Sequence, residues 1–98
     1  MSPFMNSMLG RLRCKFPDAE EFSYPFTGIT VVIIPEFTGS EMVRVAVSTC
    51  SENEQEFRRK VGLYHAYNKM LDGEFSKFRR PCNFEKFADG LACAVAST

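Results

Sequence analysis

The spacing of hydrophobic residues changes period between residues 42 and 73, and this change predicts the most regular part of the fold. Residues 42–49 alternate, because Val43, Val45 and Val47 fall on one face and the intervening side chains on the other. A period of two is typical of a half-buried strand. From about residue 52 to 71 the period predicts one face of a helix of about five turns. Its apolar and aromatic positions are Phe57, Val61, Tyr64, Tyr67 and Leu71.

Both ends of this helix carry sequence signals. Ser51 is followed three residues later by Glu54, the spacing of a capping box in which hydroxyl and carboxylate satisfy backbone N–H groups. Asp72 and Gly73 are expected to close the helix, because glycine adopts the left-handed conformation without steric cost.

Two further strands are predicted before residue 42. Residues 29–34 read Ile-Thr-Val-Val-Ile-Ile, which is typical of a central strand that is covered on both faces or packs one face against another subunit. The turn signal at residues 38–40 predicts an antiparallel hairpin between residues 29–37 and 42–49. Upstream, Phe22, Tyr24 and Phe26 alternate around Pro25, which fits an edge strand.

The two ends of the chain are expected to be helical. Apolar residues between Met5 and Leu12 have helical spacing, but Gly10 and Pro17 limit this predicted helix to a short one. Asn83 is expected to cap a last helix from residue 84 to about 96. Residues 74–81 fit either a short strand with a bulge or an irregular loop.

These elements predict a single α+β domain over residues 1–98. We expect a small antiparallel sheet, with its hairpin at about 29–49, packed by one long helix at about 52–71 and a shorter C-terminal helix at about 84–96.

Composition excludes several classes of protein. Apolar residues make up 45% of the chain and charged residues 24%, so we expect a folded chain. The twelve basic and twelve acidic residues give a net charge of zero, which argues against general nucleic-acid binding. No run of about 18 apolar residues predicts a membrane span, and the first residues lack the pattern of a secretory signal. The expected location is the cytoplasm.

The cysteines do not have the spacing of a metal site. The chain has no Cys-x-x-Cys pair and a single histidine, His65, so neither a structural zinc ion nor another cofactor is expected. A disulfide framework agrees with the number of cysteines, but without an export signal we expect free thiols in a reducing cytoplasm. The four are Cys14, Cys50, Cys82 and Cys93.

The turn at residues 48–51 is the first candidate binding site. Ser48, Thr49, Cys50 and Ser51 place hydroxyl, thiol and backbone N–H groups at the start of the predicted helix, where the helix dipole favours an anion. Capping alone is the alternative interpretation. The three glutamates at positions 52, 54 and 56 also argue against a free anion there.

Basic residues on the helix form the second candidate. Arg58, Arg59 and Lys60 are consecutive and point about 100° apart, so they do not all contact one ligand from one chain. Gly62 and His65 share a face with Arg58 and Lys69. Glycine in a helix costs about 1 kcal/mol relative to alanine, so Gly62 indicates close approach of a backbone, a partner or a ligand. The alternative is a solvated face that tolerates glycine.

Arg79 and Arg80 are the third candidate, because guanidinium groups bind phosphate or carboxylate through two parallel hydrogen bonds. The alternative is an ordinary polar loop.

Catalysis has less support. His65 is the one candidate base and Cys50 a candidate nucleophile, but they lie about four helical turns apart along the chain. We therefore expect no catalytic residue and no enzyme activity.

The junction between strand and helix resembles a pattern in small bacteriophage proteins. The matching features are Val-x-Val-Ala at residues 43–46, the Cys-Ser turn, and Phe-x-Arg-Lys-x-Gly at residues 57–62. Among proteins of assigned function it is similar to the Thoeris anti-defence 1 proteins, over about a third of the chain. These are homo-oligomeric phage proteins that sequester cyclic ADP-ribose-type signals. The resemblance implies that Phe57, Arg59, Lys60 and Gly62 belong to the helix-opening motif, with the turn at 48–51 beside it.

The sequence and the resemblance together predict a phage-type counter-defence protein in the host cytoplasm. We expect it to bind rather than convert a cyclic nucleotide immune signal, and to form a homo-oligomer. The alternative is a protein inhibitor that binds a host nuclease or defence complex directly through phenylalanine and arginine side chains.

Overall fold

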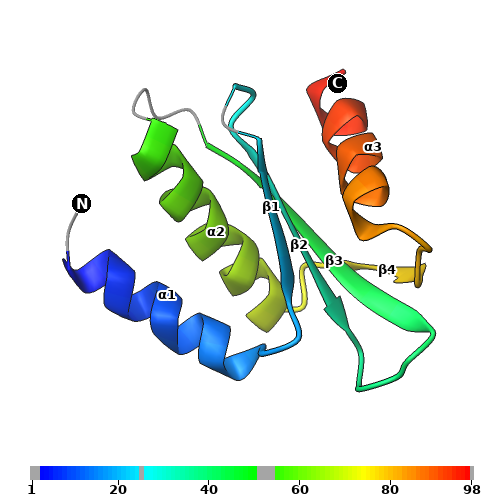
Figure 1. Ribbon diagram of the computed structural model, residues 1–98. Coiled ribbons are helices and arrows are strands. Elements are labelled where there is room, and N and C mark those ends of the chain that lie inside the picture. The colour runs from blue at the N-terminus through cyan, green and yellow to red at the C-terminus, as the bar shows by residue number, and fades with distance from the viewer. Residues whose placement is uncertain (1–2, 25, 51–54, 98) are drawn as a thin grey trace.

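The computed structural model of the chain describes residues 3–24, 26–50 and 55–97. Within these described ranges, three helices and four strands follow one another (Figure 1). In order they are α1 (Pro3–Lys15), β1 (Glu20–Tyr24), β2 (Ile29–Pro35), β3 (Met42–Thr49), α2 (Gln55–Leu71), β4 (Ser76–Arg79) and α3 (Phe84–Ala96).

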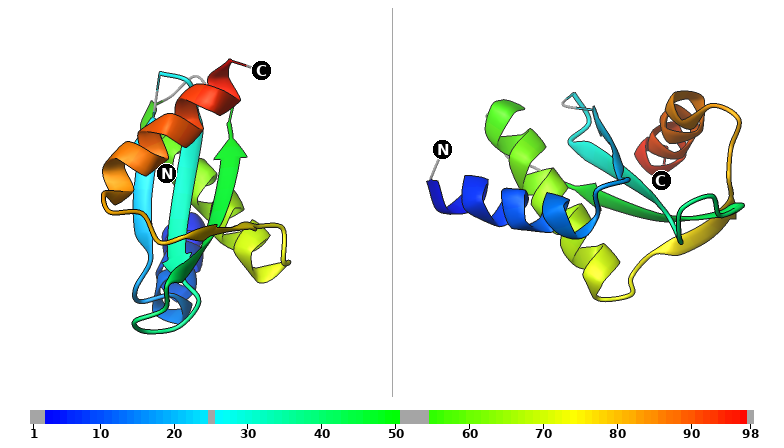
Figure 2. Two further views of the ribbon diagram at one scale, coloured as in Figure 1. Left: turned by 90° about the vertical axis from the view of Figure 1, so that its right-hand side faces the viewer. Right: turned by 60° about the horizontal axis from the view of Figure 1, so that its bottom comes forward.

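The four strands form one antiparallel sheet with the order β1-β2-β3-β4. Helices α1 and α2 lie on one side of this sheet and α3 lies on the other, as Figures 1 and 2 show from three directions. The predicted α+β class and the hairpin between residues 29 and 49 are confirmed, with β2 and β3 paired from Ile29↔Thr49 to Pro35↔Val43. The predicted edge strand is confirmed in part as β1, which contains Phe22 and Tyr24 but ends before Phe26. Residues 76–79 form a short strand rather than a loop.

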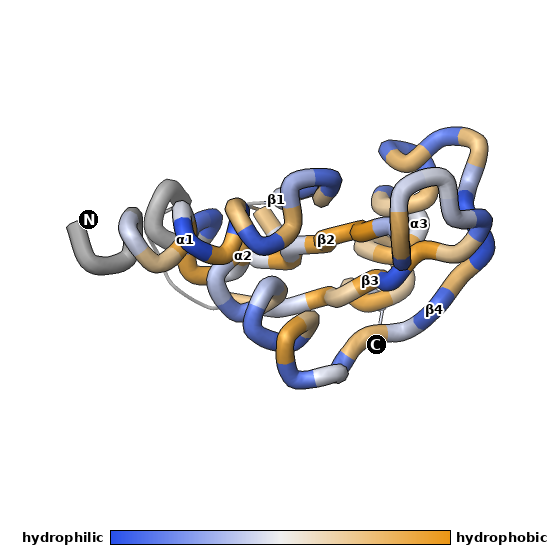
Figure 3. Tube along the Cα trace, turned by 90° about the horizontal axis from the view of Figure 1, so that it is seen from below, coloured by the Kyte–Doolittle hydropathy of each residue, from blue (hydrophilic) through white to orange (hydrophobic). Residues whose placement is uncertain are grey.

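The central strand β2 is buried along both faces, as its run of β-branched residues predicts. Val32 and Ile34 pack toward α1 and α2, whereas Ile29, Val31 and Ile33 pack toward α3. Helices of the same chain therefore cover both faces, and no second subunit is needed to bury them. Figure 3 shows the hydrophobic stretch of β2 and β3 between the helical layers.

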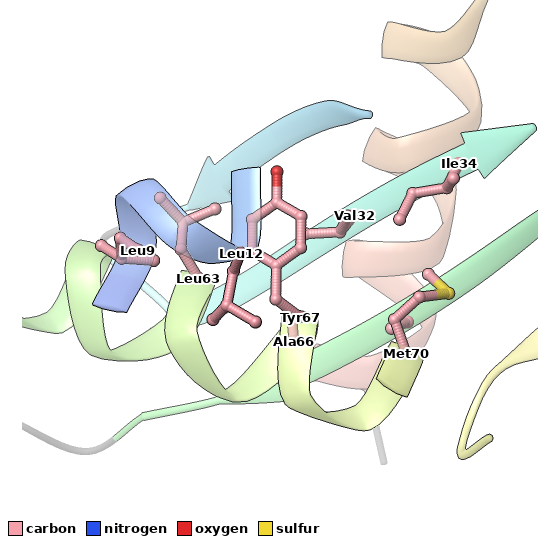
Figure 4. Close-up of a cluster of buried hydrophobic side chains, with 9 residues drawn as sticks. Leu9, Leu12, Val32, Ile34, Leu63, Ala66, Tyr67 and Met70 are labelled. Atoms are coloured by element: carbon pink, nitrogen blue, oxygen red, sulfur yellow. The ribbon is translucent and has the colours of Figure 1, made fainter. Parts of the chain in front are cut away.

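The core on the α2 side shows that the predicted face of α2 is only partly correct. Tyr67 is 1% exposed as expected, but Leu71 is 46% exposed. The face that packs on the sheet is rotated by about one residue, because Gly62 and Ala66 are small and let the helix approach the strands. Figure 4 shows the resulting cluster. Its members are Leu9, Leu12, Val32, Ile34, Ala46, Leu63, Ala66, Tyr67 and Met70.

Helix α1 is longer than its sequence predicts. It runs for 13 residues and passes through Gly10, which was expected to limit it. Leu9 and Leu12 are buried against α2, and this packing offsets the intrinsic cost of the glycine. The predicted stop at Pro17 is confirmed, since the helix ends at Lys15.

The ends of the later helices follow the sequence signals. Gly73 has a φ of +81° just after α2, as a closing glycine requires. The side chain of Asn83 accepts a hydrogen bond of 3.0 Å from the backbone N–H of Lys86, which confirms the predicted cap of α3. The predicted capping box of Ser51 and Glu54 lies outside the described residues.

Candidate functional site

The open edge of β3 is the most distinctive feature of the sheet. Strand β3 has eight residues, but β4 pairs only with its first half, from Met42↔Arg79 to Val45↔Ser76. Within the part of the chain that the structure describes, the second half of β3 has no neighbouring strand on this side. An exposed row of backbone polar groups is a feature that proteins either use for binding or cover.

The hydrogen-bond register identifies the groups that face this edge. The backbone N–H of Cys50 donates to the carbonyl of Gly28 at 2.8 Å, and that of Glu36 donates to the carbonyl of Met42 at 3.2 Å. Even-numbered residues of β3 therefore direct their backbone groups toward β2, and Val47 and Thr49 direct theirs toward the open edge. Lys69 covers one of these groups, since its Nζ donates to the Val47 carbonyl oxygen at 2.9 Å.

A hollow of about 370 Å³ lies beside this edge, on the side of α2. We call it the polar hollow, because every described side chain that lines it carries a hydrogen-bonding group. The lining residues are Ser48, Thr49, His65, Asn68, Lys69, Asp72 and Glu74. They come from the end of β3, from the second half of α2 and from the connection to β4, so the fold of one chain assembles the hollow.

Several side chains of the polar hollow are held in place by the backbone around them. Asn68 Nδ2 donates to the carbonyl of Tyr64 at 2.9 Å, and Ser48 Oγ donates to the carbonyl of Gly62 at 2.6 Å. Ser48 is only 3% exposed and its proton is already used, so its role is to join β3 to α2. Lys69 uses one N–H on Val47 and keeps two donors for other partners.

The structure brings only part of the predicted site together. Ser48, Thr49 and His65 line the polar hollow, whereas Cys50 is half-buried at the strand end. Arg59 is exposed and Lys60 half-buried on the first half of α2. The predictions for Ser51 and for the side chains of Phe57 and Arg58 lie outside what the structure describes.

Arg79 and Arg80 lie at the opposite end of β3. Arg79 pairs with Met42, seven residues from Thr49 along the strand, which corresponds to about 23 Å. Its guanidinium lies 4.0 Å from the Glu41 carboxylate, and that of Arg80 lies over the Phe84 ring at 5.4 Å from its centroid. Within one chain these arginines therefore do not share a site with Thr49, because the antiparallel register separates them.

The sequence interpretation missed Asn68, Asp72 and Glu74. Asn68 is three residues after His65 and Asp72 is three residues after Lys69, so helical spacing places them on one side of the last turns of α2. Glu74 joins them only because the chain turns at Gly73 and runs toward β4. Spacing signals the first two, whereas the third depends on the path of the connection.

A second polar cluster ties α1, β1 and α2 together. Arg13 donates to both carboxylate oxygens of Glu21 at 2.8 and 2.9 Å, and the Tyr67 hydroxyl donates to Glu21 Oε2 at 2.5 Å. Burial alone would raise the pKa of Glu21, but the hydrogen bonds from Arg13 and Tyr67 lower this pKa below its ordinary value. Burial and the bond to Glu21 raise the pKa of Tyr67. Because each group already has its partners, we assign this cluster a structural role.

Metal ligands, cysteines and membrane-spanning helices are further features that would indicate a function. Among the described residues, no three histidine, cysteine or acidic side chains are grouped so that they could hold a metal ion. All four cysteines are free thiols, with Cys14, Cys82 and Cys93 exposed. Among the described residues, no helix combines the length and apolar character that a membrane span requires.

No protein-family model matches the chain, and neither a curated protein nor a solved structure shows significant similarity to it.

Proposed function

We propose that the protein acts by binding a small nucleotide-type ligand in the polar hollow and holding it without converting it. One observation carries this proposal: Lys69 and His65 line the same hollow as Asp72 and Glu74. A nucleotide presents both kinds of group that such a lining can satisfy, because its phosphates are anionic acceptors and its ribose hydroxyls are donors.

Each lining residue has a role in this proposal. Lys69 and His65 bind phosphate oxygens, Lys69 through the two N–H groups that Val47 leaves unused. Asp72 and Glu74 accept hydrogen bonds from ribose hydroxyls, as acidic residues do in dinucleotide sites. Thr49 and Asn68 complete the polar contacts. The volume of about 370 Å³ is at the lower end of the range for small-molecule sites, which suits a compact ligand.

The composition of the lining supports holding rather than turnover. Covalent catalysis needs a nucleophile beside a base that activates it. None of the described lining residues is a cysteine, and the proton of the Ser48 hydroxyl is donated to the Gly62 carbonyl. Thr49 carries the other hydroxyl of the lining, and among the described residues no hydrogen bond joins it to the candidate base His65. The ligand is therefore expected to leave chemically unchanged.

The biological setting that we propose rests on the strand–turn–helix motif at residues 43–62. Its resemblance to the Thoeris anti-defence 1 proteins favours a cyclic ADP-ribose-like signal as the ligand. It also favours a phage-type counter-defence role in the host cytoplasm, carried out by a homo-oligomer. The polar hollow does not depend on this setting, so its ligand is tested independently.

Isothermal titration calorimetry with cyclic ADP-ribose, ADP-ribose and AMP tests the proposal. We expect His65→Ala to weaken binding by about tenfold, the loss of one hydrogen bond to a charged phosphate, and Lys69→Met to weaken it at least as much. Arg79→Ala is the matched control, since Arg79 is a basic residue at the other end of β3. Equal affinity in wild type, Lys69→Met and His65→Ala would refute the assignment of the polar hollow.

The open edge of β3 favours a second candidate function, direct binding of a protein. Val47 and Thr49 direct backbone groups outward, and a hollow of about 320 Å³ lies on the α3 side of the same edge. It is lined in part by Val45, Val47 and Leu91. An extended strand of a partner would pair with β3 and place alternate apolar side chains in this hollow.

Lys69→Met distinguishes the two functions. The substitution frees the Val47 carbonyl, so it should strengthen strand addition while it weakens nucleotide binding. Capture from host lysate by wild type and Lys69→Met, quantified by mass spectrometry, provides the comparison. A host protein recovered in greater amount with Lys69→Met would favour the inhibitor, whereas equal recovery of every protein would exclude this edge as its binding surface.

A further inference from the structure

A third hollow lies on the side of the sheet opposite the polar hollow, between the β1–β2 turn and the last turns of α3, and we call it the α3 hollow. Its volume is about 450 Å³, larger than that of the polar hollow. Figure 1 shows the turn and the end of α3 beside one another. Its lining residues are Ser23, Tyr24, Phe26, Thr27, Asp89, Ala92, Cys93 and Ala96.

The lining of the α3 hollow is mainly apolar, and it includes a phenylalanine with unusually high exposure. Phe26 is 91% exposed, although a phenylalanine normally gains stability from burial. Ala92 and Ala96, which also line the hollow, are small and one helical turn apart on α3. A lining that combines an exposed ring with small residues suits a flat or slender apolar body.

The charge of the α3 hollow is negative. Tyr24 donates from its hydroxyl to Asp89 Oδ1 at 2.5 Å, which fixes the carboxylate and leaves its second oxygen for another donor. Glu85 lies one turn earlier on the same side of α3. Burial, the bond to Asp89 and the charges of Asp89 and Glu85 all raise the pKa of Tyr24. None of the described residues that line the hollow is basic, so the carboxylate charge is not neutralised there.

We propose that the α3 hollow is a binding site for a small organic amine with an aromatic body. The ammonium group would bind Asp89, and the apolar body would lie against Phe26, Ala92 and Ala96. This site is separate from the polar hollow, because it lies on the other face of the sheet and shares no lining residue with it.

Tryptamine and indole-3-propionate test the charge requirement, since they share a ring and differ in the sign of the charge. By NMR titration we expect wild type to bind tryptamine at least about tenfold more tightly than indole-3-propionate. Asp89→Asn keeps an acceptor for Tyr24 but removes the charge, and it should bring the two affinities to within about threefold. Glu74→Gln, which removes a carboxylate of the polar hollow, should preserve the preference. No preference in wild type, or an unchanged preference in Asp89→Asn, would overturn the proposal.

Thiol labelling locates the ligand independently of any substitution. Cys93 is exposed and lines the α3 hollow, whereas Cys14 and Cys82 are exposed elsewhere. Saturating tryptamine should slow iodoacetamide modification of Cys93 severalfold and leave the other two rates unchanged, as resolved by peptide mass spectrometry. Equal rates at Cys93 with and without tryptamine would also overturn the proposal.

Discussion

The Ser48 hydroxyl donates a hydrogen bond of 2.6 Å to the carbonyl oxygen of Gly62, and this contact joins the end of β3 to the middle of α2. The neighbouring Thr30 lies so close that a Cβ on Gly62 would collide with Thr30 Oγ1 and come within 3.2 Å of Thr30 Cβ. Gly62 is therefore required by the packing of α2 on the sheet. The sequence suggested close approach of a backbone, a partner or a ligand at Gly62, whereas the close neighbours in the structure are the side chains of Thr30 and Ser48 on β2 and β3.

Gly62→Ala tests this packing. The added methyl group is expected to destabilise the protein by about 1–3 kcal/mol, the range for overpacking a filled core, despite the better helix propensity of alanine. Gly90→Ala is the control, because an added Cβ at that exposed position of α3 has no atom within 4 Å. It should stabilise by about 0.5–1 kcal/mol. Urea denaturation measures both, and a stabilising Gly62→Ala would contradict the packing described above.

The carboxylate of Glu21 is expected to make stability fall in acid. Hydrogen bonds from Arg13 and Tyr67 outweigh burial and hold the pKa of Glu21 below its ordinary value of 4.5. The corresponding stabilisation is fully present above about pH 4.5 and is lost as the pH falls through the lowered pKa. The difference in free energy of unfolding between wild type and Glu21→Gln should therefore shrink between pH 5 and about pH 3. Glu20→Gln, at the exposed position before it, should track wild type at every pH.

The raised pKa of Tyr67 predicts that the stability of the folded protein also falls at high pH. Its pKa is raised above the ordinary value of 10.0 by burial and by the bond to Glu21, so its stabilisation is present below pH 10 and is lost as the pH rises further. Tyr67→Phe should lower stability by about 1–3 kcal/mol at pH 7, because the half-buried Glu21 carboxylate loses a donor. It should also flatten the loss of stability above pH 10, measured by circular dichroism. Tyr64→Phe should leave that loss unchanged.

Asn83 sets the start of α3. Its side chain satisfies the backbone N–H of Lys86, and Asn83→Ala should cost about 0.5–2 kcal/mol. Asn83→Asp keeps the acceptor and should cost little. If both substitutions were neutral in thermal unfolding, the cap would not contribute to the stability of the helix.

Local patterns predicted the elements well, because their causes are local. The β-branched run of Ile29–Ile34 dictates a strand buried on both faces, and Gly73 dictates the end of α2. The prediction that Gly10 would shorten α1 was wrong for a non-local reason. Burial of Leu9 and Leu12 against α2 offsets the cost of the glycine, and no short-range sequence pattern reveals this packing.

The binding surface was harder to predict, because it depends on strand register. Thr49 is polar, Arg79 is basic, and both lie at strand ends. The antiparallel pairing of β3 with β4 nevertheless places them at opposite ends of β3. Lys69 and Glu74 reach the same hollow as Thr49 only through the packing of α2 on β3 and the path of the chain after Gly73. Neither relationship is encoded by spacing along one element.

Native mass spectrometry of the protein with cyclic ADP-ribose tests the central claim most directly. We predict a ligand-bound species with one ligand per chain in wild type and in Arg79→Ala, and a strongly reduced one in Lys69→Met. The ligand released on unfolding should have its original mass. A bound fraction that is equal in Lys69→Met and wild type, or a released ligand of altered mass, would contradict a protein that holds its ligand in the polar hollow.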